Sequence, residues 1–276
     1  MTDASESRPR EVLVIGGGVA GLTAALYTER AGLDTVVVTD GESILRRNAH
    51  LENVPGFPAG VNSATFLDML AAQATRNGVD LVEGTVVELG RAAGGGAAEP
   101  AEADDGEDDG TPGFEATLDA GDAIRADRVI AASWSDTGYL EGLGVDLRDA
   151  GSKQYVQVDG SGRTTVDGLY AAGRLAEMYH QAVVAAGHGA QVGITLIHDA
   201  DVPYYHDWVA PEGYFTDRGR EVPPGCEEID ETERRARERE SMAAMREYFA
   251  EPHPERQRTH PSLTDDPENR LPEADD

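Results

Sequence analysis

Residues 11–31 read EVLVIGGGVAGLTAALYTERA, and this stretch decides the fold. The apolar run from Glu11 to Ile15 ends in glycine, and from Ala20 to Ala31 apolar residues recur at helical spacing. The pattern predicts a buried strand, a glycine turn and a helix without a gap. A second apolar run, Thr35 to Thr39 (TVVVT), completes a β-α-β unit of the expected length.

The glycine turn has the form G-x-G-x-x-G and lies between the predicted strand and helix, where a dinucleotide fingerprint belongs. In that motif Gly16 permits the tight turn, Gly18 lets the backbone approach a pyrophosphate, and Gly21 lets helix and strand pack closely. The helix N-terminus adds unpaired N–H groups and a positive dipole end. The predicted contacts in this turn are Gly16, Gly18, Val19, Ala20 and Gly21. The alternative is a glycine turn that binds nothing.

A dinucleotide of this kind needs a ribose contact at the end of the second strand. Thr39 occupies the usual position of that contact, and the acidic Asp40 follows one residue later. We therefore predict that both residues lie at the cofactor.

The rest of the chain predicts an α/β protein: a three-layer Rossmann-type domain with a small β-meander, a C-terminal helix and a disordered tail. Expected helices cover 63–77, beginning with a serine cap, 181–197 and 228–249. Expected strands cover 81–89, 114–118, 126–132 and 168–172. The expected organisation is a flexible N-terminus (1–10), a nucleotide-binding domain (11–205) with an acidic disordered insertion (92–113), an aromatic segment and helix (206–251) and a disordered acidic tail (252–276).

Three further stretches show a resemblance to a known family. Residues 164–173 (TTVDGLYAAG) and 179–189 (YHQAVVAAGHG) resemble the C-terminal FAD signature of the thioredoxin reductase family of flavoproteins. Residues 51–58 (LENVPGFP) are similar to the segment that flanks the flavin ring in that family. The resemblance spans roughly residues 11–198 and implies that the cofactor is FAD.

The family also implies where individual residues contact FAD. Gly173 matches a glycine at the ribityl chain and pyrophosphate, while Arg174 stands where the family has an aspartate. The backbone N–H groups of Gln181 and Ala182 would face the reduced flavin from a helix N-terminus. The remaining positions carried over are Asn48 and Asn53 near the ring, Val86 near adenine, and Ala132 in a turn that reads Ala131-Ala132-Ser133 here.

The family carries an NADPH-binding domain with a cysteine pair between its two FAD halves, and the sequence leaves no room for one. A β-α-β unit needs ~30 residues, but only residues 134–153 separate Ser133 from Gln154. Cys226 is the single cysteine, so a C-x-x-C pair is excluded. The resemblance therefore implies an FAD-binding oxidoreductase without its own nicotinamide domain or dithiol.

Three functions stay open: an oxidoreductase acting on a small-molecule substrate or a redox partner protein, a non-catalytic FAD-binding or interaction module, and a scaffold that has lost FAD. No catalytic residue is assigned. His50, Tyr179 and His180 could act as acid or base, although such residues commonly only shape a pocket.

No metal site is expected, because His198, His206 and the neighbouring aspartates match no ligand spacing. Met242, Met245 and Phe249 recur at helical spacing and are expected to pack against the domain or against a second subunit in a homodimer.

The chain is strongly acidic, with 52 acidic against 23 basic residues and a formal net charge of −29. Such a surface repels nucleic-acid phosphates and anionic membrane headgroups, so neither is expected as a partner. The N-terminus resembles no signal peptide and no apolar run is long enough to cross a bilayer, which favours a cytoplasmic protein. Because the carboxylates are spread along the whole length, the acidic surface is interpreted as halophilic.

This interpretation predicts that the midpoint of thermal unfolding is higher in molar KCl than in dilute buffer, because salt screens repulsion among the carboxylates. Calorimetry at a series of KCl concentrations measures the effect. Equal midpoints in both solvents would contradict it.

Overall fold

The computed structural model describes residues 8–41, 43–92, 113–204 and 206–256. The chain divides into two compact units, one formed by residues 1–43 and 73–196 and the other by residues 44–72 and 197–276. The expected nucleotide-binding domain over 11–205 is therefore interrupted in the structure by residues 44–72. The core of the expected acidic insertion (93–112) and the end of the expected tail (257–276) lie outside the described residues.

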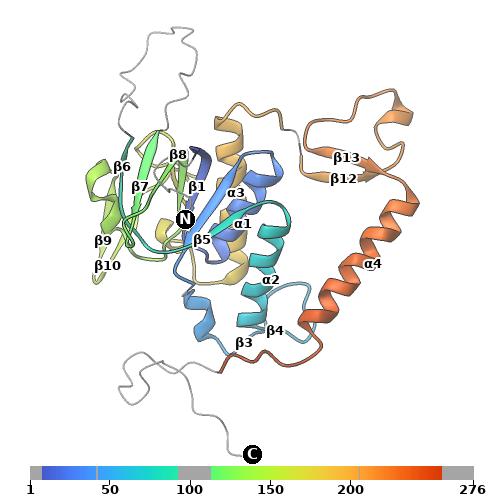
Figure 1. Cartoon of the computed structure of the whole chain (residues 1–276), viewed down its shortest axis with the longest axis horizontal. Helices are drawn as coiled ribbons and strands as arrows, with labels where there is room; N and C mark the ends of the chain where they lie inside the picture. The colour runs from blue at the N-terminus through green and yellow to red at the C-terminus, as the bar shows by residue number, and fades with distance from the viewer. Residues whose placement is uncertain (1–7, 42, 93–112, 205, 257–276) are drawn as a thin grey trace, which may run out of the picture. The chain divides into compact units, whose positions relative to one another are not determined.

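A parallel sheet forms the centre of the first unit, with its strands in the order β5-β2-β1-β8 and with β11 beside β8 (Figure 1). Val12, Leu13 and Val14 in β1 are all 0% exposed, as expected for a strand covered on both faces. The bounds of these strands are β1 (Arg10–Ile15), β2 (Thr35–Thr39), β5 (Asp80–Glu83), β8 (Ala123–Ala131) and β11 (Leu169–Ala171). The predicted α/β fold is confirmed.

Two helices, α1 (Val19–Arg30) and α3 (Ala182–Asp199), lie side by side on the sheet (Figure 1). They approach each other closely because α3 carries glycines at the crossing. A Cβ at Gly189 would lie 2.2 Å from the carbonyl oxygen of Ala20, and one at Gly193 would lie 3.0 Å from that of Ala24. These two glycines of α3 therefore allow close packing of the two helices.

A three-stranded antiparallel meander forms the third layer, from β6 (Val86–Arg91), β7 (Phe114–Leu118) and the first half of β8. The main hydrophobic cluster joins it to the parallel sheet: Leu13, Val36 and Val129 pack in the same core as Leu89, Phe114, Leu140 and Leu169. Leu140 comes from a short 3-10 helix, η3 (Gly138–Leu143), that packs on β6.

The single strand predicted over 81–89 is wrong, because the chain forms two strands there. Leu81 and Val82 lie in β5, parallel to β2. Gly84 then takes φ +156° and donates its N–H to the carbonyl of Thr39 (3.0 Å), after which β6 begins the meander. The glycine allows the chain to leave one layer and enter the other.

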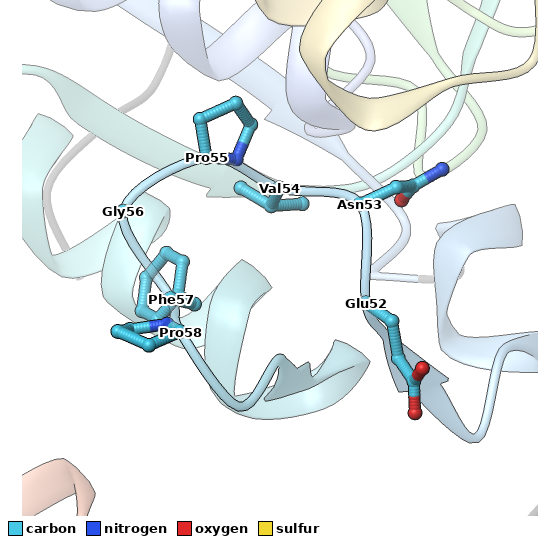
Figure 2. Close-up of a pocket in the computed structure, with 7 residues that line it drawn as sticks. All are labelled: Glu52, Asn53, Val54, Pro55, Gly56, Phe57 and Pro58. Atoms are coloured by element: carbon cyan, nitrogen blue, oxygen red, sulfur yellow. The ribbon is translucent and has the colours of Figure 1, made fainter.

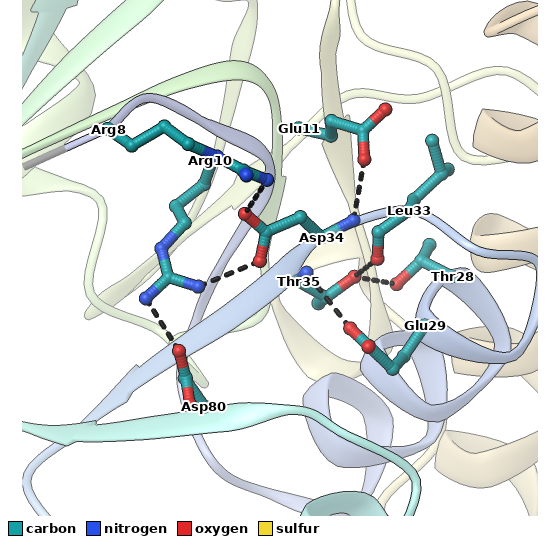
Figure 3. A network of polar contacts seen from close by, with 9 residues as sticks. All are labelled: Arg8, Arg10, Glu11, Thr28, Glu29, Leu33, Asp34, Thr35 and Asp80. Carbon is teal, nitrogen blue, oxygen red and sulfur yellow. Dashed lines mark hydrogen bonds and ion pairs between the residues drawn. The ribbon is translucent and has the colours of Figure 1, made fainter.

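A polar network closes the amino ends of the parallel strands (Figure 3). Asp34 accepts hydrogen bonds from Arg8 (3.0 Å) and Arg10 (2.7 Å), and Arg10 also donates to Asp80 (2.5 Å). Inside this network the hydroxyls of Thr28 and Thr35 are 2.9 Å apart, and both residues are fully buried. The network ties β1, β2, β5 and α1 together and leaves the carboxyl ends of the strands for a ligand site.

Between η3 and β11 the chain forms an antiparallel hairpin of β9 (Leu147–Ala150) and β10 (Lys153–Val156). After β11 a short 3-10 helix, η4 (Gly173–Ala176), leads toward α3.

The second unit contains helix α2 (Ser63–Arg76), whose last residues reach into the first unit's range, and helix α4 (Glu231–Tyr248). The predicted serine cap on α2 is wrong: Asn62 accepts the N–H groups of Ala64 (2.8 Å) and Thr65 (3.1 Å). The N-cap of α4 is Asp230, which accepts the N–H of Glu233 at 2.7 Å. Shorter elements are η2 (Ile44–Arg47), β3 (His50–Leu51), β4 (Val61–Asn62), β12 (Trp208–Pro211), η5 (Thr216–Arg218) and β13 (Cys226–Ile229).

The expected packing of α4 is seen at one residue only. Phe249 follows the helix and meets the ring of Phe57 at 6.3 Å between centroids, but Phe249, Met242 and Met245 are 51%, 53% and 41% exposed. The first residues of the expected disordered tail also make contacts. His253 lies 2.9 Å from the carboxylate of Asp68, and Glu255 pairs with Arg46.

No helix in the described part of the chain is long and apolar enough to cross a membrane.

Glu228 organises the loop between β12 and β13. Its carboxylate accepts the backbone N–H groups of Gly213 (2.9 Å), Phe215 and Thr216 (3.1 Å) and the Thr216 hydroxyl (2.7 Å). Desolvation raises the pKa of Glu228, but the hydrogen bonds from Phe215, Thr216 and Gly213 outweigh it and lower the pKa to about 2. The charged carboxylate therefore holds the loop.

We predict that Glu228→Gln lowers the thermal stability of the second unit at neutral pH. A neutral amide cannot accept four hydrogen bonds as a carboxylate does. Since the folded pKa is lowered, the stabilisation is present above the ordinary pKa of 4.5 and is lost as the pH falls toward about 2. Thermal unfolding followed by near-UV circular dichroism of the Trp208, Tyr214 and Phe215 rings measures this. Glu221→Gln removes the same charge without these bonds; equal behaviour of both variants would contradict the prediction.

Candidate functional site

The first part of the site is the turn between β1 and α1. Gly16 has φ +112°, donates its N–H to the carbonyl of Val38 (2.8 Å), and has no room for a side chain because a Cβ would lie 2.6 Å from the Ala132 carbonyl oxygen. Ala132 in turn donates its N–H to Ile15 (2.8 Å). The predicted site residues Gly16 and Ala132 therefore lie together at the carboxyl ends of β1 and β8.

The N-terminus of α1 lies beside this turn and has no side-chain cap. Gly18 is the N-cap, no acidic residue occupies the first turn, and the first helical hydrogen bond runs from Leu22 N to Gly18 O (2.9 Å). The N–H groups of Val19, Ala20 and Gly21 thus have no partner within the helix. A Cβ at Gly18 would meet only the Ser43 hydroxyl, at 3.8 Å. Open space, backbone donors and a positive helix end together fit a diphosphate.

Gly21 faces inward. A Cβ there would lie 2.0 Å from the Gly16 carbonyl oxygen, so this glycine sets the spacing between helix and strand, as predicted for the third glycine of the motif.

The turn after β11 packs against the same helix. Gly173 has φ +67°, and a Cβ there would lie 2.7 Å from the Cβ of Ala20. Its N–H donates to Nδ1 of His188 (3.0 Å), and burial lowers the pKa of His188. A neutral imidazole is needed to accept this bond. Sequence reasoning missed His188, although its place between Gly187 and Gly189 in a tightly packed helix was a usable signal.

The predicted ribose and adenine contacts gather at the carboxyl end of β2. The Thr39 hydroxyl accepts the N–H of Gly41 (3.1 Å) and packs on Gly17, while Asp40 is exposed. The bond from Gly84 to Thr39 brings the start of β6, and with it the buried Val86, to this region. Thr39, Asp40 and Val86 therefore lie in one neighbourhood.

Arg174 is held by the protein itself. Its guanidinium donates to the Tyr155 hydroxyl and to the Met178 carbonyl (3.1 Å), and it lies 4.6 Å above the Tyr155 ring. Its Nε is buried and has no hydrogen-bond partner. In this arrangement the side chain is directed to β10, so Arg174 is not oriented as a phosphate ligand.

The start of α3 offers fewer donors than expected. The N–H of Gln181 donates to the Tyr179 carbonyl (2.8 Å), so it is already used. Ala182, 8% exposed, opens the helix, and its N–H belongs to the first turn, which has no partner within the helix. Ala182 is therefore the better placed of the two predicted donors.

Asn48 and Asn53 belong to the second unit. Asn48 donates its side-chain amide to the Leu45 carbonyl (3.1 Å), and its own carbonyl accepts the Ser63 hydroxyl. Asn53 lies on a loop, residues 52–58, that curves around an open hollow of about 360 Å³ (Figure 2). Phe57 fixes the loop by an edge contact with Phe66 at 6.1 Å.

The candidate acids and bases differ in environment. His50 is exposed and lies 3.8 Å from Glu52, and Tyr179 is 81% exposed. His180 contacts the ring of Trp134 at 4.7 Å, and its pKa is lowered by desolvation and by the charges of Arg174 and Lys153. Within the residues that the structure describes, no group of three His, Cys, Asp or Glu side chains could hold a metal ion.

Comparison with known families gives two matches along the chain. Residues 11–50 match the family described as FAD binding domain, and residues 51–189 match the family described as pyridine nucleotide-disulphide oxidoreductase. Among individual relatives, a thioredoxin reductase of Streptomyces coelicolor is 43% identical over 82 residues, 28% of this chain and 25% of the relative. A thioredoxin reductase of Aquifex aeolicus is 37% identical over 79 residues, 28% and 24% of the two chains. The aligned part thus spans about a quarter of the relatives.

Solved structures show the same fold. An oxidoreductase from Agrobacterium tumefaciens superposes with a TM-score of 0.58 at 16% identity, covering 71% of this chain and 100% of the other. A thioredoxin reductase from Streptococcus pyogenes gives 0.59 at 13% identity, covering 71% and 99%.

The geometry of the turn predicts that Gly18→Ala folds normally but binds FAD at least about tenfold more weakly, roughly 1.4 kcal/mol. Gly18 has φ −80°, and an added methyl meets no protein atom closer than 3.8 Å, so only the ligand would clash. FAD affinity measured by calorimetry, with melting of the flavin-free protein, separates the two effects. Gly187→Ala, another open glycine, is the control. Unchanged FAD affinity in Gly18→Ala would show that the diphosphate lies elsewhere.

Proposed function

Because this chain belongs to the pyridine nucleotide-disulphide oxidoreductase family and its cofactor is FAD, we propose that it is an FAD-dependent oxidoreductase that works without a nicotinamide domain or dithiol of its own. Its substrate is a small molecule or a redox partner protein. The activity is our proposal, since the matched part of the chain covers only 25% of the Streptomyces coelicolor relative.

The observation that carries the proposal is the cradle at Gly16 and Gly18. A turn with no space for a side chain, next to a helix N-terminus with no cap and no acidic residue, leaves backbone donors for a diphosphate. Gly173 completes the cradle from the opposite part of the sequence, where it packs on Ala20.

Bound FAD supplies electron and hydride transfer, and this chain's residues hold it in place. Val19 and Ala20 would donate N–H groups to the phosphates, and Thr39 with Asp40 would hold the ribose. Ala182, at the positive end of α3, would donate to the part of the ring that gains charge. His188 fixes Gly173 and so positions the backbone beside the cofactor.

The proposed lack of a nicotinamide domain is supported by the segment between β8 and β11. Its described residues form η3 and the β9–β10 hairpin. Cys226 is the single cysteine of the sequence, so an internal dithiol cannot form. Under this proposal, electrons reach the flavin from the substrate itself and leave to an acceptor such as a quinone or a redox protein.

The alternative is a non-catalytic FAD-binding or interaction module. One observation favours it: Arg174, in place of the family's aspartate, is committed to Tyr155 and Met178 rather than to the cofactor. The net charge of −29 supports a salt-adapted cytoplasmic protein that binds neither nucleic acid nor anionic membranes.

The proposal predicts a yellow protein whose flavin is reduced by light or dithionite but is not bleached by stoichiometric NADH or NADPH. Visible absorbance under anaerobic conditions follows each reaction. Rapid bleaching by NADH or NADPH would refute the proposal that the chain has no nicotinamide-binding site. Protein that stays colourless and takes up no FAD would refute the oxidoreductase proposal.

The same preparation separates the enzyme from the module. For an enzyme, quinone acceptors reoxidise the photoreduced protein faster than free reduced flavin. If every acceptor reacts more slowly with the protein than with free reduced flavin, the result supports a non-catalytic FAD-binding module instead.

A further inference from the structure

Basic and aromatic side chains gather beyond the carboxyl ends of β8 and β11. Lys153, the only lysine in the sequence, lies with its Nζ 5.4 Å above the ring of Trp134. The ring of His180 packs against the same indole at 4.7 Å. Arg174 lies over the ring of Tyr155, which is two residues from Lys153 on β10 and so on the same face of that strand. We call these five residues the β10 cluster.

The β10 cluster contains two cationic side chains, Lys153 and Arg174. In the described part of the chain, neither Lys153 nor Arg174 forms an ion pair, although the sequence has 52 acidic residues. Glu177, three residues after Arg174, accepts hydrogen bonds from Arg148, and these bonds together with the charges of Arg148 and Arg174 lower its pKa. The buried Nε of Arg174 has no acceptor. The charges of Arg174 and Lys153 also add to desolvation in lowering the pKa of His180.

One residue of this cluster and one residue beside it have unusual backbone conformations. Trp134 and Glu177 both have φ +63°, a region that side-chain-bearing residues rarely adopt. The ring of Trp134 contacts both Lys153 and His180, and Glu177 pairs with Arg148, which lies over the ring of Tyr155. Strained backbone of this kind concentrates at binding sites.

The β10 cluster and the diphosphate cradle contact different elements. Gly173 backs onto Ala20 of α1, whereas the next side chain, Arg174, turns to Tyr155 on β10. Gly173 of the cradle thus packs on α1, whereas its neighbour Arg174 in the cluster contacts β10.

We propose that the β10 cluster is an anion subsite that binds the carboxylate or phosphate group of a small substrate, with Lys153 and His180 as the direct donors and Arg174 reinforcing the charge. This substrate assignment rests on the proposed oxidoreductase function. The indole of Trp134 would then contact the rest of the substrate. We therefore infer that the substrate is a small organic anion.

Calorimetric titration with benzoate and with inorganic phosphate tests the subsite, each at ionic strength held constant with KCl. Both flavin-loaded and flavin-free protein are used. We expect saturable binding in both states, and a dissociation constant raised at least tenfold by Lys153→Gln. Benzoate binding alone identifies a carboxylate site, and phosphate binding alone a phosphate site. The indole N–H resonance of Trp134, assigned with Trp208→Phe, should shift on binding.

The matched control is Arg239→Gln on α4, which removes one positive charge outside the cluster and should change affinity less than twofold. An equal rise of the dissociation constant in Lys153→Gln and Arg239→Gln would overturn the subsite. Such a result would mean that only the net charge of the protein, acting at long range, affects anion binding. Loss of binding on loading with FAD would also overturn it, since the cluster would then belong to the cofactor site. If the protein takes up no FAD but binds the anions through Lys153, the proposed function fails while the anion subsite stands.

Discussion

The structure of the first unit depends on how closely backbone approaches backbone at the carboxyl end of β1. Side-chain-free positions at Gly16, Gly21 and Gly189 bring α1 within contact of the turn before it and of α3 beside it, at distances that a Cβ could not tolerate. This close approach brings the N-terminus of α1 next to the ends of β8 and β11. Because the packing is between main chains, the donors of the site are fixed by the fold and need no particular side chain.

Much of this unit could be predicted from sequence because its signals are local. The strand β2 has the predicted bounds, and α1 and α3 differ from prediction by one or two residues at their ends, since apolar period and glycine position determine them. The errors come from long-range pairing. That Gly84 splits an apolar run depends on its bond to Thr39, and that His253 and Glu255 are held depends on Asp68 and Arg46. Neither partner can be identified from the neighbouring sequence.

The residues of the candidate site also differ in whether local sequence could predict them. The cradle was predictable because glycines define it, whereas the orientation of Arg174 and the role of His188 depend on residues distant in sequence, Tyr155 and Gly173. The Gln181 donor was overestimated because a helix start read from sequence does not reveal a bond to the residue two positions earlier. The sequence likewise does not show that Lys153 forms no ion pair in the described part of the chain, since counting acids along a chain does not reveal which cations they contact.

Strand β8 belongs to two layers at once. Residues 126–131 pair with β1, while residues 123–126 pair with β7 in the meander, and Ala126 takes part in both ladders. Opening either layer therefore strips hydrogen bonds from the same strand. The parallel sheet and the meander should consequently exchange their amide protons as one cooperative block, so that a destabilising change in the meander is felt at the nucleotide turn without any contact between them.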